Sequence, residues 1–310
     1  MKAVRLLRAG GPASVDVADI ERPPIAPGKI LVAVRAAGVN PFDWKLTTGM
    51  IPVGLPFVLG GDFSGVIESV GPGVDDFHAG DEVFGGASRF SGGSGSFAEY
   101  ALASVETVAR KPRSLDFLHA SALPLAGVSA LQALTEHIEL TVGQKILIHG
   151  GAGGIGTMAI QLAQDLGAYI ATTVKAEQAD FVQRFGADLV IDYEKVRFEE
   201  PVKDFDAVFD TVGGETYRRS IGVLKKGGVL VSMVEKPDEE AAKARGIRAI
   251  GQTTRVTRAR LEALARLADE RAISVHIDRV FPLESAGDAL AHLKDGHPMG
   301  KVVLQWDPIG

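Results

Sequence analysis

A glycine-rich segment between two regular elements is the part of this sequence best suited to binding an anion. Residues 149–156 read HGGAGGIG and follow the apolar run Lys145–His149, which predicts a short buried strand. Ile155–Leu166 then carries apolar residues at helical spacing, and Gly167 follows as a stop signal. Glycine permits a sharp turn and close approach of the backbone, while the first N–H groups of a helix point at an anion. The segment therefore predicts a phosphate-binding turn between a strand and a helix.

The spacing of the glycines matches dinucleotide binding in two registers. Gly151, Gly153 and Gly156 satisfy G-x-G-x-x-G, and Gly150 replaces Gly151 in a G-x-x-G-x-x-G register. A turn with a purely structural role is the alternative, but the strand and helix that the motif requires are both present. The residues expected to contact the cofactor here are Gly151, Ala152, Gly153, Gly154, Ile155 and Gly156.

The end of the next predicted strand, Tyr169–Val174, indicates which dinucleotide is bound. An NAD site commonly has an acidic residue there, about 20 residues after the glycines, to bind the ribose 2′-hydroxyl. This strand instead has Thr173 near its end and is followed by Lys175, which suits a 2′-phosphate, and Tyr193 after the third strand could stack or donate its hydroxyl nearby. Lys175 could also be an ordinary surface lysine, and a small shift in the register of the following loop would bring the Glu177 carboxylate to the ribose. The prediction is NADPH in preference to NADH.

Two later predicted strands end in residues that a ligand could contact. In a doubly wound fold the ligand binds at the carboxyl ends of the strands. Contacts to the adenosine and nicotinamide, mostly through the backbone, are therefore expected from Thr211, Val212, Gly213, Ser232, Met233 and Val234.

The order of the predicted elements indicates two domains. From about Ser114, short strands alternate with helical patterns, which predicts a parallel sheet with helices on both faces. Residues 1–115 instead hold short apolar runs broken by Gly-Gly, Pro-Gly and Gly-Asp, and residues 273–310 return to short strands around one helix. We expect an α/β fold in which a Rossmann domain, a doubly wound parallel sheet of residues 116–272, is inserted into a split β domain.

Composition excludes several classes of protein. The chain has 33 basic and 39 acidic residues, a formal charge of −6, so nothing attracts it globally to nucleic acid or anionic membranes. It has no cysteine, which removes disulfides, Fe–S clusters and cysteine-ligated zinc, and its histidines show no metal-binding spacing. No apolar run reaches about 18 residues, and the first residues lack a signal-peptide core. We expect a cytoplasmic protein with no metal site and no nucleic-acid or membrane partner.

Several stretches together resemble the medium-chain dehydrogenase/reductase superfamily, in its zinc-free quinone oxidoreductase (zeta-crystallin-like) and alkenal or enone reductase branch. The matching stretches are Ala36–Gly49, Pro56–Val74, Gly80–Gly85, Ala122–Leu134, Ile148–Gly156 and Asp210–Glu215. The resemblance implies that the split β domain is GroES-like and catalytic, that the active-site cleft lies between it and the Rossmann domain, and that the protein forms a homodimer through the Rossmann sheets.

The sequence departs from the zinc-containing members of that superfamily. Their catalytic zinc is bound by Cys and His in the stretch that here reads GVNPFD, by the His of a GHE motif and by a later Cys. This chain has Asn40 in the first stretch, GGD at residues 60–62 in the second, and no cysteine. The resemblance therefore implies hydride transfer without zinc. A quinone or an α,β-unsaturated carbonyl suits such a site, because its product anion is delocalised and hydrogen bonds can stabilise it.

The catalytic candidates lie in NPFDWK at residues 40–45. The resemblance places Asn40 near the nicotinamide, Lys45 could donate a hydrogen bond or a proton to an enolate oxygen, and Asp43 could orient Lys45. Each has a structural alternative, since Asn-Pro initiates turns and Asp caps helices. Ser129 stands where the family often has Thr beside the nicotinamide, and it could instead bond the backbone of its own helix.

These observations predict an NADPH-dependent, zinc-independent reductase of quinones or of enals and enones. The alternative in another class is a non-catalytic NADPH-binding protein, either a redox sensor or a structural protein. An enoyl-thioester reductase is a third interpretation, but it needs a further binding region for a phosphopantetheine arm, and the sequence shows no distinct basic patch for one.

Overall fold

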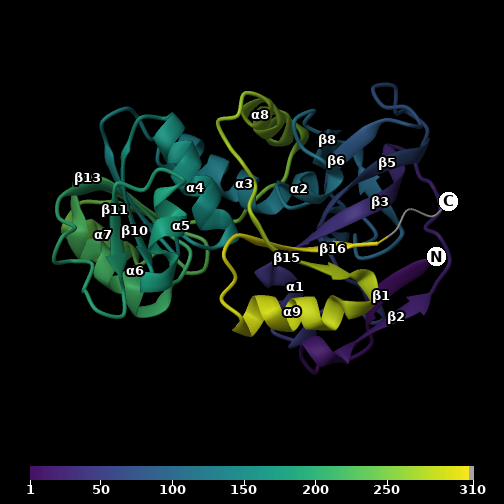
Figure 1. Ribbon diagram of the computed structural model, residues 1–310, viewed down its shortest axis with the longest axis horizontal. Coiled ribbons are helices and arrows are strands. Elements are labelled where there is room, and N and C mark those ends of the chain that lie inside the picture. Colours follow the sequence, from purple (N-terminus) through teal and green to yellow (C-terminus); the bar gives the residue numbers. More distant parts are fainter. Residues whose placement is uncertain (307–310) are drawn as a thin grey trace. The chain divides into compact units, whose positions relative to one another are not determined.

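The computed structural model describes residues 1–306, which fold into two compact units (Figure 1). Unit 1 comprises Met1–Val128, Val256–Arg271 and the chain from Val275 on, and unit 2 comprises Ser129–Arg255 with Ala272–Ser274. The sequence-based boundaries lie at residues 115 and 272. The units divide elsewhere because helices α2 (Phe117–Ser121) and α8 (Arg258–Asp269) pack on strands of unit 1.

Unit 2 is built on a six-stranded sheet whose strands all run parallel. The strands are β9 (Lys145–His149), β10 (Tyr169–Val174), β11 (Leu189–Asp192), β12 (Phe205–Asp210), β13 (Leu224–Ser232) and β14 (Arg248–Gly251). Their spatial order, β11-β10-β9-β12-β13-β14, is the doubly wound order in which the direction of winding reverses between β9 and β12. The predicted Rossmann architecture is confirmed, and the ligand crevice of such a sheet lies at that reversal.

Helices connect the strands of unit 2. They are α3 (Pro124–Leu131, shared with unit 1) and the π-helical turn Gln132–His137, α4 (Gly154–Asp165), α5 (Ala179–Gln183), α6 (Gly214–Ser220) and α7 (Glu239–Arg245). Helix α6 ends at Ser220, and by Leu224 the chain is already in β13, where this residue pairs with Phe205. The apolar faces of β9, β12 and β13 supply Leu147, Val208 and Leu230 to the core, where Tyr217 of α6 packs against them.

Unit 1 contains a seven-stranded sheet and a small three-stranded one. The larger sheet consists of β3 (Lys29–Val39), β5 (Asp62–Val70), β6 (Glu82–Gly86), β7 (Tyr100–Ser104), β8 (Val108–Arg110), β15 (Ile277–Pro282) and β16 (Lys301–Gln305). The smaller sheet has the order β2 (Val15–Asp19), β1 (Lys2–Leu6), β4 (Phe57–Val58). All pairs are antiparallel except β15 with β16, as expected for a mostly antiparallel β unit.

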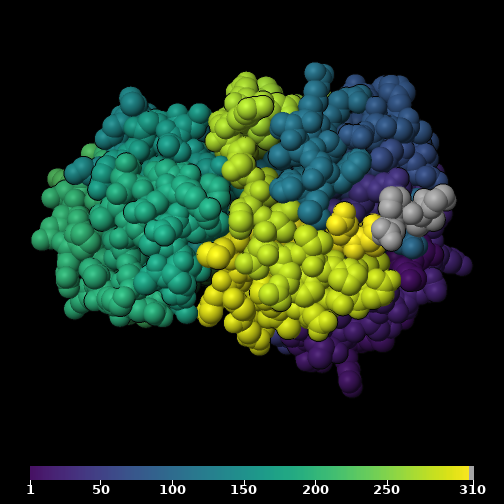
Figure 2. All heavy atoms as spheres, in the orientation of Figure 1, coloured from purple at the N-terminus to yellow at the C-terminus, as the bar shows by residue number. Residues whose placement is uncertain are grey.

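The C-terminal segment completes the sheet of unit 1. Strand β16 pairs antiparallel with β3, Val302 lying opposite Val39, although the two are far apart in the chain. In the space-filling view the yellow C-terminal residues accordingly lie among the purple and blue N-terminal ones (Figure 2). The predicted insertion of one domain into a split β domain is confirmed.

Four further helices belong to unit 1, and one of them positions polar residues. They are α1 (Pro41–Thr47), α2, α8 and α9 (Ala286–Asp295). Helix α1 was not expected from the sequence. Asn40 precedes it, Pro41 is its first residue, and the Asp43 carboxylate accepts the Asn40 backbone N–H at 2.8 Å. The apolar face of α8 is formed by the buried residues Leu261, Leu264 and Ala268. Within residues 1–306, no helix has both the length and the apolar character that crossing a bilayer demands.

Candidate functional site

The glycine loop after β9 has the conformation that its sequence predicts. Gly150 has a φ of 72°, and a Cβ there would lie 2.7 Å from Thr211 Oγ1. A Cβ on Gly151 would overlap Thr172 Oγ1, and one on Gly156 would overlap the Gly150 carbonyl and lie 2.7 Å from Gly151 Cα. These three positions must be glycine because the loop and the first turn of α4 pack against their own neighbours.

Gly153 differs from these glycines, and the difference indicates a ligand. It is the N-cap of α4, and a Cβ on it would come no closer than 3.5 Å to any other part of the chain. Packing therefore does not require glycine at this position. A pyrophosphate at the helix N-terminus would require it, because the backbone must approach the phosphate oxygens without a side chain between them. The loop fits the phosphates of a dinucleotide.

A buried carboxylate that the sequence analysis missed organises the ends of β12 and β13. Asp210 Oδ1 accepts the backbone N–H groups of Val212 (3.0 Å) and Gly213 (2.9 Å), and Oδ2 accepts the Ser232 hydroxyl at 2.7 Å. Ser232 Oγ in turn accepts the N–H of Val234 at 3.2 Å. Asp210 thus holds in place, at the crevice, the two strand-end segments predicted to contact the ligand, residues 211–213 after β12 and residues 232–234 at the end of β13.

The strand-end segments expose apolar surface. Val212 and Val234 are 56% and 45% exposed, although both follow directly on buried strands. Thr211 does not point into open space, because its hydroxyl donates to the carbonyl of His149 at 2.8 Å. Exposed valines at the carboxyl ends of parallel strands are the surface on which a doubly wound domain binds the flat rings of its ligand.

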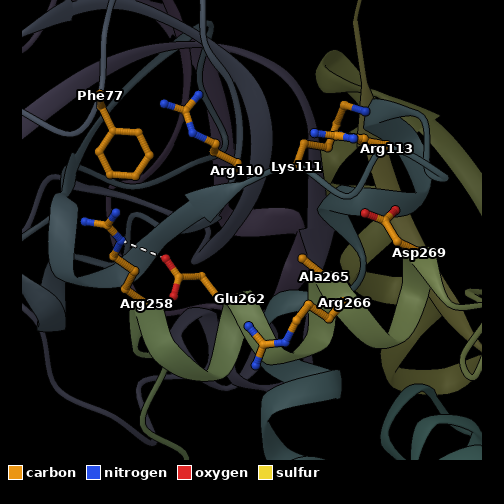
Figure 3. A pocket seen from close by; sticks show the side chains of 9 residues that line it. All are labelled: Phe77, Arg110, Lys111, Arg113, Arg258, Glu262, Ala265, Arg266 and Asp269. Carbon is orange, nitrogen blue, oxygen red and sulfur yellow. Dashed lines mark hydrogen bonds and ion pairs between the residues drawn. The ribbon is translucent and has the colours of Figure 1, made fainter.

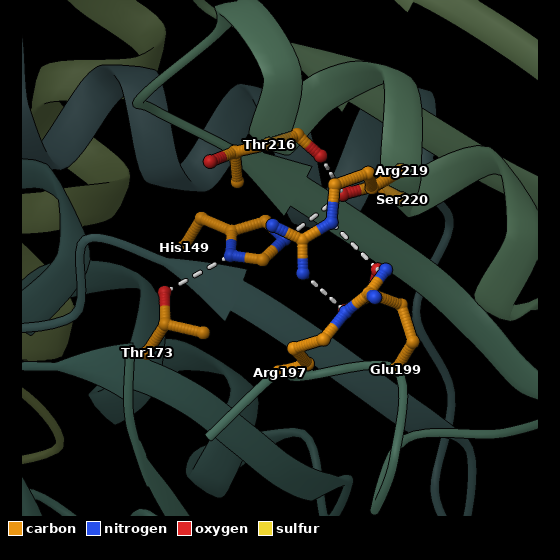
Figure 4. A network of polar contacts seen from close by, with 7 residues as sticks. All are labelled: His149, Thr173, Arg197, Glu199, Thr216, Arg219 and Ser220. Carbon is orange, nitrogen blue, oxygen red and sulfur yellow. Dashed lines mark hydrogen bonds and ion pairs between the residues drawn. The ribbon is translucent and has the colours of Figure 1, made fainter. Parts of the chain in front are cut away.

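His149, the last residue of β9, contacts side chains of β10 and α6 (Figure 4). Its Nδ1 lies 2.9 Å from Thr173 Oγ1 and its Nε2 lies 2.9 Å from Ser220 Oγ. Because Ser220 Oγ donates its own proton to the Thr216 carbonyl, it must accept from His149 Nε2–H, and Nδ1 then accepts from Thr173. The imidazole is fully buried against Phe198, and burial lowers its pKa to about 4, so it is neutral at pH 7.

The neutral state of His149 makes a prediction for the pH dependence of stability. The unfolded chain binds a proton near pH 6.5 and the folded chain only near pH 4, so stability present above pH 6.5 is lost as the pH falls towards 4. Between pH 7 and pH 5 the loss should be about 2 kcal/mol. Denaturant unfolding of the natural chain and of His149→Asn at both pH values checks this. The variant should have the lower free energy of unfolding at pH 7, and the difference between the two proteins should be smaller at pH 5. An equal difference at both pH values would contradict the prediction.

The residues predicted to recognise the 2′-phosphate lie together after β10 and β11. Lys175 Nζ is 3.6 Å from Glu194 Oε1. Tyr193 is 51% exposed; desolvation raises the pKa of its hydroxyl, and the nearby Lys175 charge opposes that rise. No carboxylate occupies the tip of β10 itself, and Glu177 is exposed in the following turn. The Lys175 ammonium is only weakly held by an exposed partner and can turn to a phosphate.

The structure gives two of the three catalytic candidates buried partners. Asn40 bonds Asp62 through Nδ2 at 2.9 Å, and Asp43 bonds the Asn40 backbone rather than Lys45. Lys45 is half-buried, with its ammonium 5.9 Å from the centre of the Trp44 ring. These residues belong to unit 1 and the cofactor residues above to unit 2. That they act at one site stays a prediction.

Ser129 lies in a polar cluster of unit 2 that sequence patterns do not reveal. It is buried, and its hydroxyl lies 2.7 Å from Thr254 Oγ1. Gln252 donates to the Ser129 carbonyl at 2.9 Å, and the Gln252 Oε1 atom is buried with no hydrogen-bond partner among the described residues.

A cavity of about 300 Å³ in unit 1 is lined by none of the predicted site residues (Figure 3). Its cationic residues are Arg110, Lys111, Arg113, Arg258 and Arg266. Arg258 is paired with Asp76 (2.9 Å) and Glu262 (3.0 Å), whereas Arg113 and Arg266 have no ion pair within the described part of the chain. These residues form no basic patch in the sequence, because they come from segments about 150 positions apart.

The metal-ligating side chains of residues 1–306 are scattered. No group of three or more His, Asp or Glu side chains in this part of the chain is arranged to hold a metal ion.

A parallel sheet in doubly wound order, a glycine loop open for a pyrophosphate and a split β domain define a nicotinamide-dependent dehydrogenase or reductase. Residues 26–113 match the family described as "Alcohol dehydrogenase GroES-like domain", and residues 185–304 match "Zinc-binding dehydrogenase". The chain belongs to the medium-chain dehydrogenase/reductase superfamily, in its zeta-crystallin-like quinone oxidoreductase branch, and is an oxidoreductase.

Three comparisons place the chain within that branch. It is 31% identical to a chloroplast envelope quinone oxidoreductase homolog of Arabidopsis thaliana, over 96% of this chain and 95% of that protein. It is 33% identical to the NADPH-dependent alkenal/one oxidoreductase of the same plant, over 94% of this chain and 76% of that protein. Its fold matches the structure of the quinone oxidoreductase from Coxiella burnetii with a TM-score of 0.93 and 35% identity, covering 99% of both chains.

Proposed function

We propose that the protein is a zinc-independent, NADPH-dependent reductase that transfers hydride to a quinone or to an α,β-unsaturated carbonyl. The observation that carries the proposal is the crevice of unit 2. There the open position at Gly153 accommodates a pyrophosphate, and the next strand is followed by Lys175 in place of an acidic residue. The names of the relatives, a quinone oxidoreductase homolog and an NADPH-dependent alkenal/one oxidoreductase, support the same chemistry.

The chain's own residues bind, orient and neutralise charge in this proposal. The nicotinamide supplies the hydride when NADPH is bound. The loop from Gly151 to Gly156 holds the pyrophosphate, and the segments after β12 and β13 form the surface for the rings. Asn40 and Lys45 donate hydrogen bonds to the oxygen of the acceptor, where negative charge develops, and Lys45 supplies the proton. Asp43 holds the backbone of Asn40 rather than acting on the substrate.

A direct test is NADPH oxidation with a small panel of quinones, enals and enones, after NADPH affinity has been measured by calorimetry. Turnover of at least one class, unaffected by a chelator, is expected. Tight NADPH binding without any turnover would instead support the alternative proposal of a non-catalytic redox sensor or structural protein.

Lys45→Met should separate the proton donor from the cofactor site. If Lys45 protonates the product anion, kcat should fall by about 100-fold while the Kd for NADPH stays unchanged, because the variant keeps the apolar stem and removes only the ammonium. Steady-state kinetics and calorimetry measure the two quantities. Lys294→Met, an exposed lysine of α9, is the matched control. Unaltered kcat in Lys45→Met would remove Lys45 from the mechanism.

Lys175→Ala and Glu194→Gln should change NADPH affinity in opposite directions. The first removes the cation proposed for the 2′-phosphate and should weaken NADPH binding about tenfold. The second removes the carboxylate that now pairs with Lys175 and repels a phosphate, so it should tighten NADPH binding. NADH lacks the 2′-phosphate and is the control ligand. Equal effects on NADH and NADPH in calorimetric titrations would contradict this assignment.

An enoyl-thioester reductase is a second candidate, favoured by the basic cavity of unit 1. Arg113 and Arg266 are available there for the phosphates of a coenzyme A thioester. Turnover of crotonyl-CoA with a KM at least tenfold lower than that of crotonaldehyde, and loss of this advantage in Arg113→Ala/Arg266→Ala, would support it. Equal KM values for the thioester and the aldehyde would count against it.

A homodimer and a cytoplasmic location remain part of the proposal. Strand β14 lies at the edge of the sheet of unit 2, where a second copy could extend the sheet. Light scattering on the purified protein measures the oligomeric state, and a proline at Ala249, within this edge strand, should reduce the dimer.

A further inference from the structure

Four polar side chains lie buried together at the start of α1. Asn40, Asp43, Asp62 and Lys301 are 4%, 3%, 2% and 4% exposed. Two of the residues are anionic when ionised, one is cationic, and one is an amide. Asn40 and Asp43 belong to the NPFDWK motif and are catalytic candidates from sequence, whereas Asp62 and Lys301 have no role predicted from sequence. Such a group costs free energy to bury, so its arrangement calls for a reason.

Sheet register brings these residues together. Val39 pairs with Val302, which places Lys301 beside Asn40 although 261 positions separate them. Gly38 makes room on the other side, since a Cβ there would lie 3.3 Å from Asp62 Cβ and 2.5 Å from the Ser121 carbonyl. The cluster is therefore a product of the β16–β3–β5 pairing and cannot be found from local sequence.

Lys301 and Asp62 hold the two ends of the Asn40 amide. The Lys301 ammonium donates to Asn40 Oδ1 and, at 3.1 Å, to the Val39 carbonyl. Asn40 Nδ2 donates to Asp62 Oδ2 at 2.9 Å. An ammonium can only donate and a carboxylate can only accept, so a flipped amide would meet repulsion at both ends. The amide has one orientation, which leaves one N–H and one oxygen lone pair for a ligand.

Electrostatics tie the members of the cluster to one another. Burial raises the pKa of Asp43 to about 7 and raises that of Asp62, while the Lys301 charge opposes both shifts. Burial lowers the pKa of Lys301, and the two carboxylates oppose that shift. Removing the Lys301 charge alone would leave two buried carboxylates without a cation. Removing the Asp62 and Lys301 charges together leaves only the Asp43 carboxylate, which still accepts the Asn40 backbone N–H.

We propose that Lys301 and Asp62 are positioning residues that fix the Asn40 amide in the one orientation in which it serves hydride transfer. The inference rests on the proposed function, in which Asn40 acts at the nicotinamide or the acceptor. In this assignment Lys301 contacts neither the nicotinamide nor the acceptor, and it acts only through Asn40. The lysine coupled to Asn40 is Lys301 rather than Lys45, the lysine of the sequence motif.

Asp62→Asn, Lys301→Met and the double variant form the test. Each single variant should lower both the melting temperature and kcat. The double variant should recover much of the melting temperature lost in Lys301→Met, because one buried carboxylate, Asp43, remains in place of two and keeps its backbone hydrogen bond. Its kcat should nevertheless stay at least tenfold below that of the natural protein, with KM for NADPH changed less. Lys294→Met should leave both measurements unchanged. If kcat recovers together with the melting temperature, the residues serve only stability and the proposal is overturned.

A measurement that needs no turnover separates this proposal from the proposed function. In nitrogen-15 spectra, the two Nδ2 protons of Asn40, identified by their loss in Asn40→Asp, should exchange slowly with solvent in the natural protein. They should exchange at least tenfold faster in the double variant. Equal protection in both proteins overturns the positioning role, whatever the enzyme assay shows. Absence of turnover in the natural protein would contradict the proposed function. The amide exchange rates would still decide whether Lys301 and Asp62 hold the Asn40 side chain.

Discussion

Gly153→Ala should leave the protein folded and as stable as the natural chain but weaken NADPH binding by about 100-fold. The reason lies in what surrounds this position. A Cβ on Gly153 meets nothing within the chain closer than 3.5 Å, so the free protein has room for it. No room for this Cβ remains once the pyrophosphate is bound, because the phosphate oxygens must reach the backbone N–H groups at the start of α4. Calorimetric titration with NADPH and thermal unfolding without it measure the two effects separately.

Alanine variants of two other glycines serve as controls for Gly153→Ala. Gly156→Ala should lose both stability and affinity, since its Cβ would overlap the Gly150 carbonyl. Gly222→Ala should change neither, because Gly222 is exposed and has open space around it. If Gly153→Ala bound NADPH as tightly as Gly222→Ala, the loop would not be the pyrophosphate site.

The glycine loop could be predicted from sequence because its determinants are local. The motif, the strand before it and the helix after it lie within about 25 consecutive residues, and each part constrains its neighbours. The split domain was also predictable, since strands and helices alternate only in the middle of the chain. Neither inference required knowledge of which strands pair.

The residues that hold the candidate site together could not be predicted in the same way. Asp210 meets Ser232, His149 meets Ser220, and Lys301 meets Asn40 only once the sheets have formed. In the sequence His149 is one of seven histidines with no spacing that distinguishes it. Helix α1 is a different case. Asn-Pro as a turn and Asp as a helix cap were each considered separately, but with Asp at the third helical position they form one local capping signal for a helix.

Asp210→Asn should cost about 3 kcal/mol of unfolding free energy and weaken NADPH binding at least tenfold. An amide can supply one oxygen for the N–H groups of Val212 and Gly213, but its NH2 group must then face Ser232. The Ser232 hydroxyl would have to accept that bond and would lose the acceptor for its own proton, which now goes to Asp210 Oδ2 at 2.7 Å. Both strand-end segments would lose the anchor that orders them before the cofactor binds.

Ser232→Ala provides the companion variant for a double-mutant cycle. Alone it should cost about 1 kcal/mol, because it removes one hydrogen bond to the buried carboxylate and the acceptor for the Val234 N–H. In the Asp210→Asn background it should cost much less, since the hydroxyl there is already mismatched. Urea unfolding without NADPH measures all four proteins. Strictly additive losses would mean that the two residues stabilise unit 2 independently, and that the shared anchor of the β12 and β13 ends does not exist.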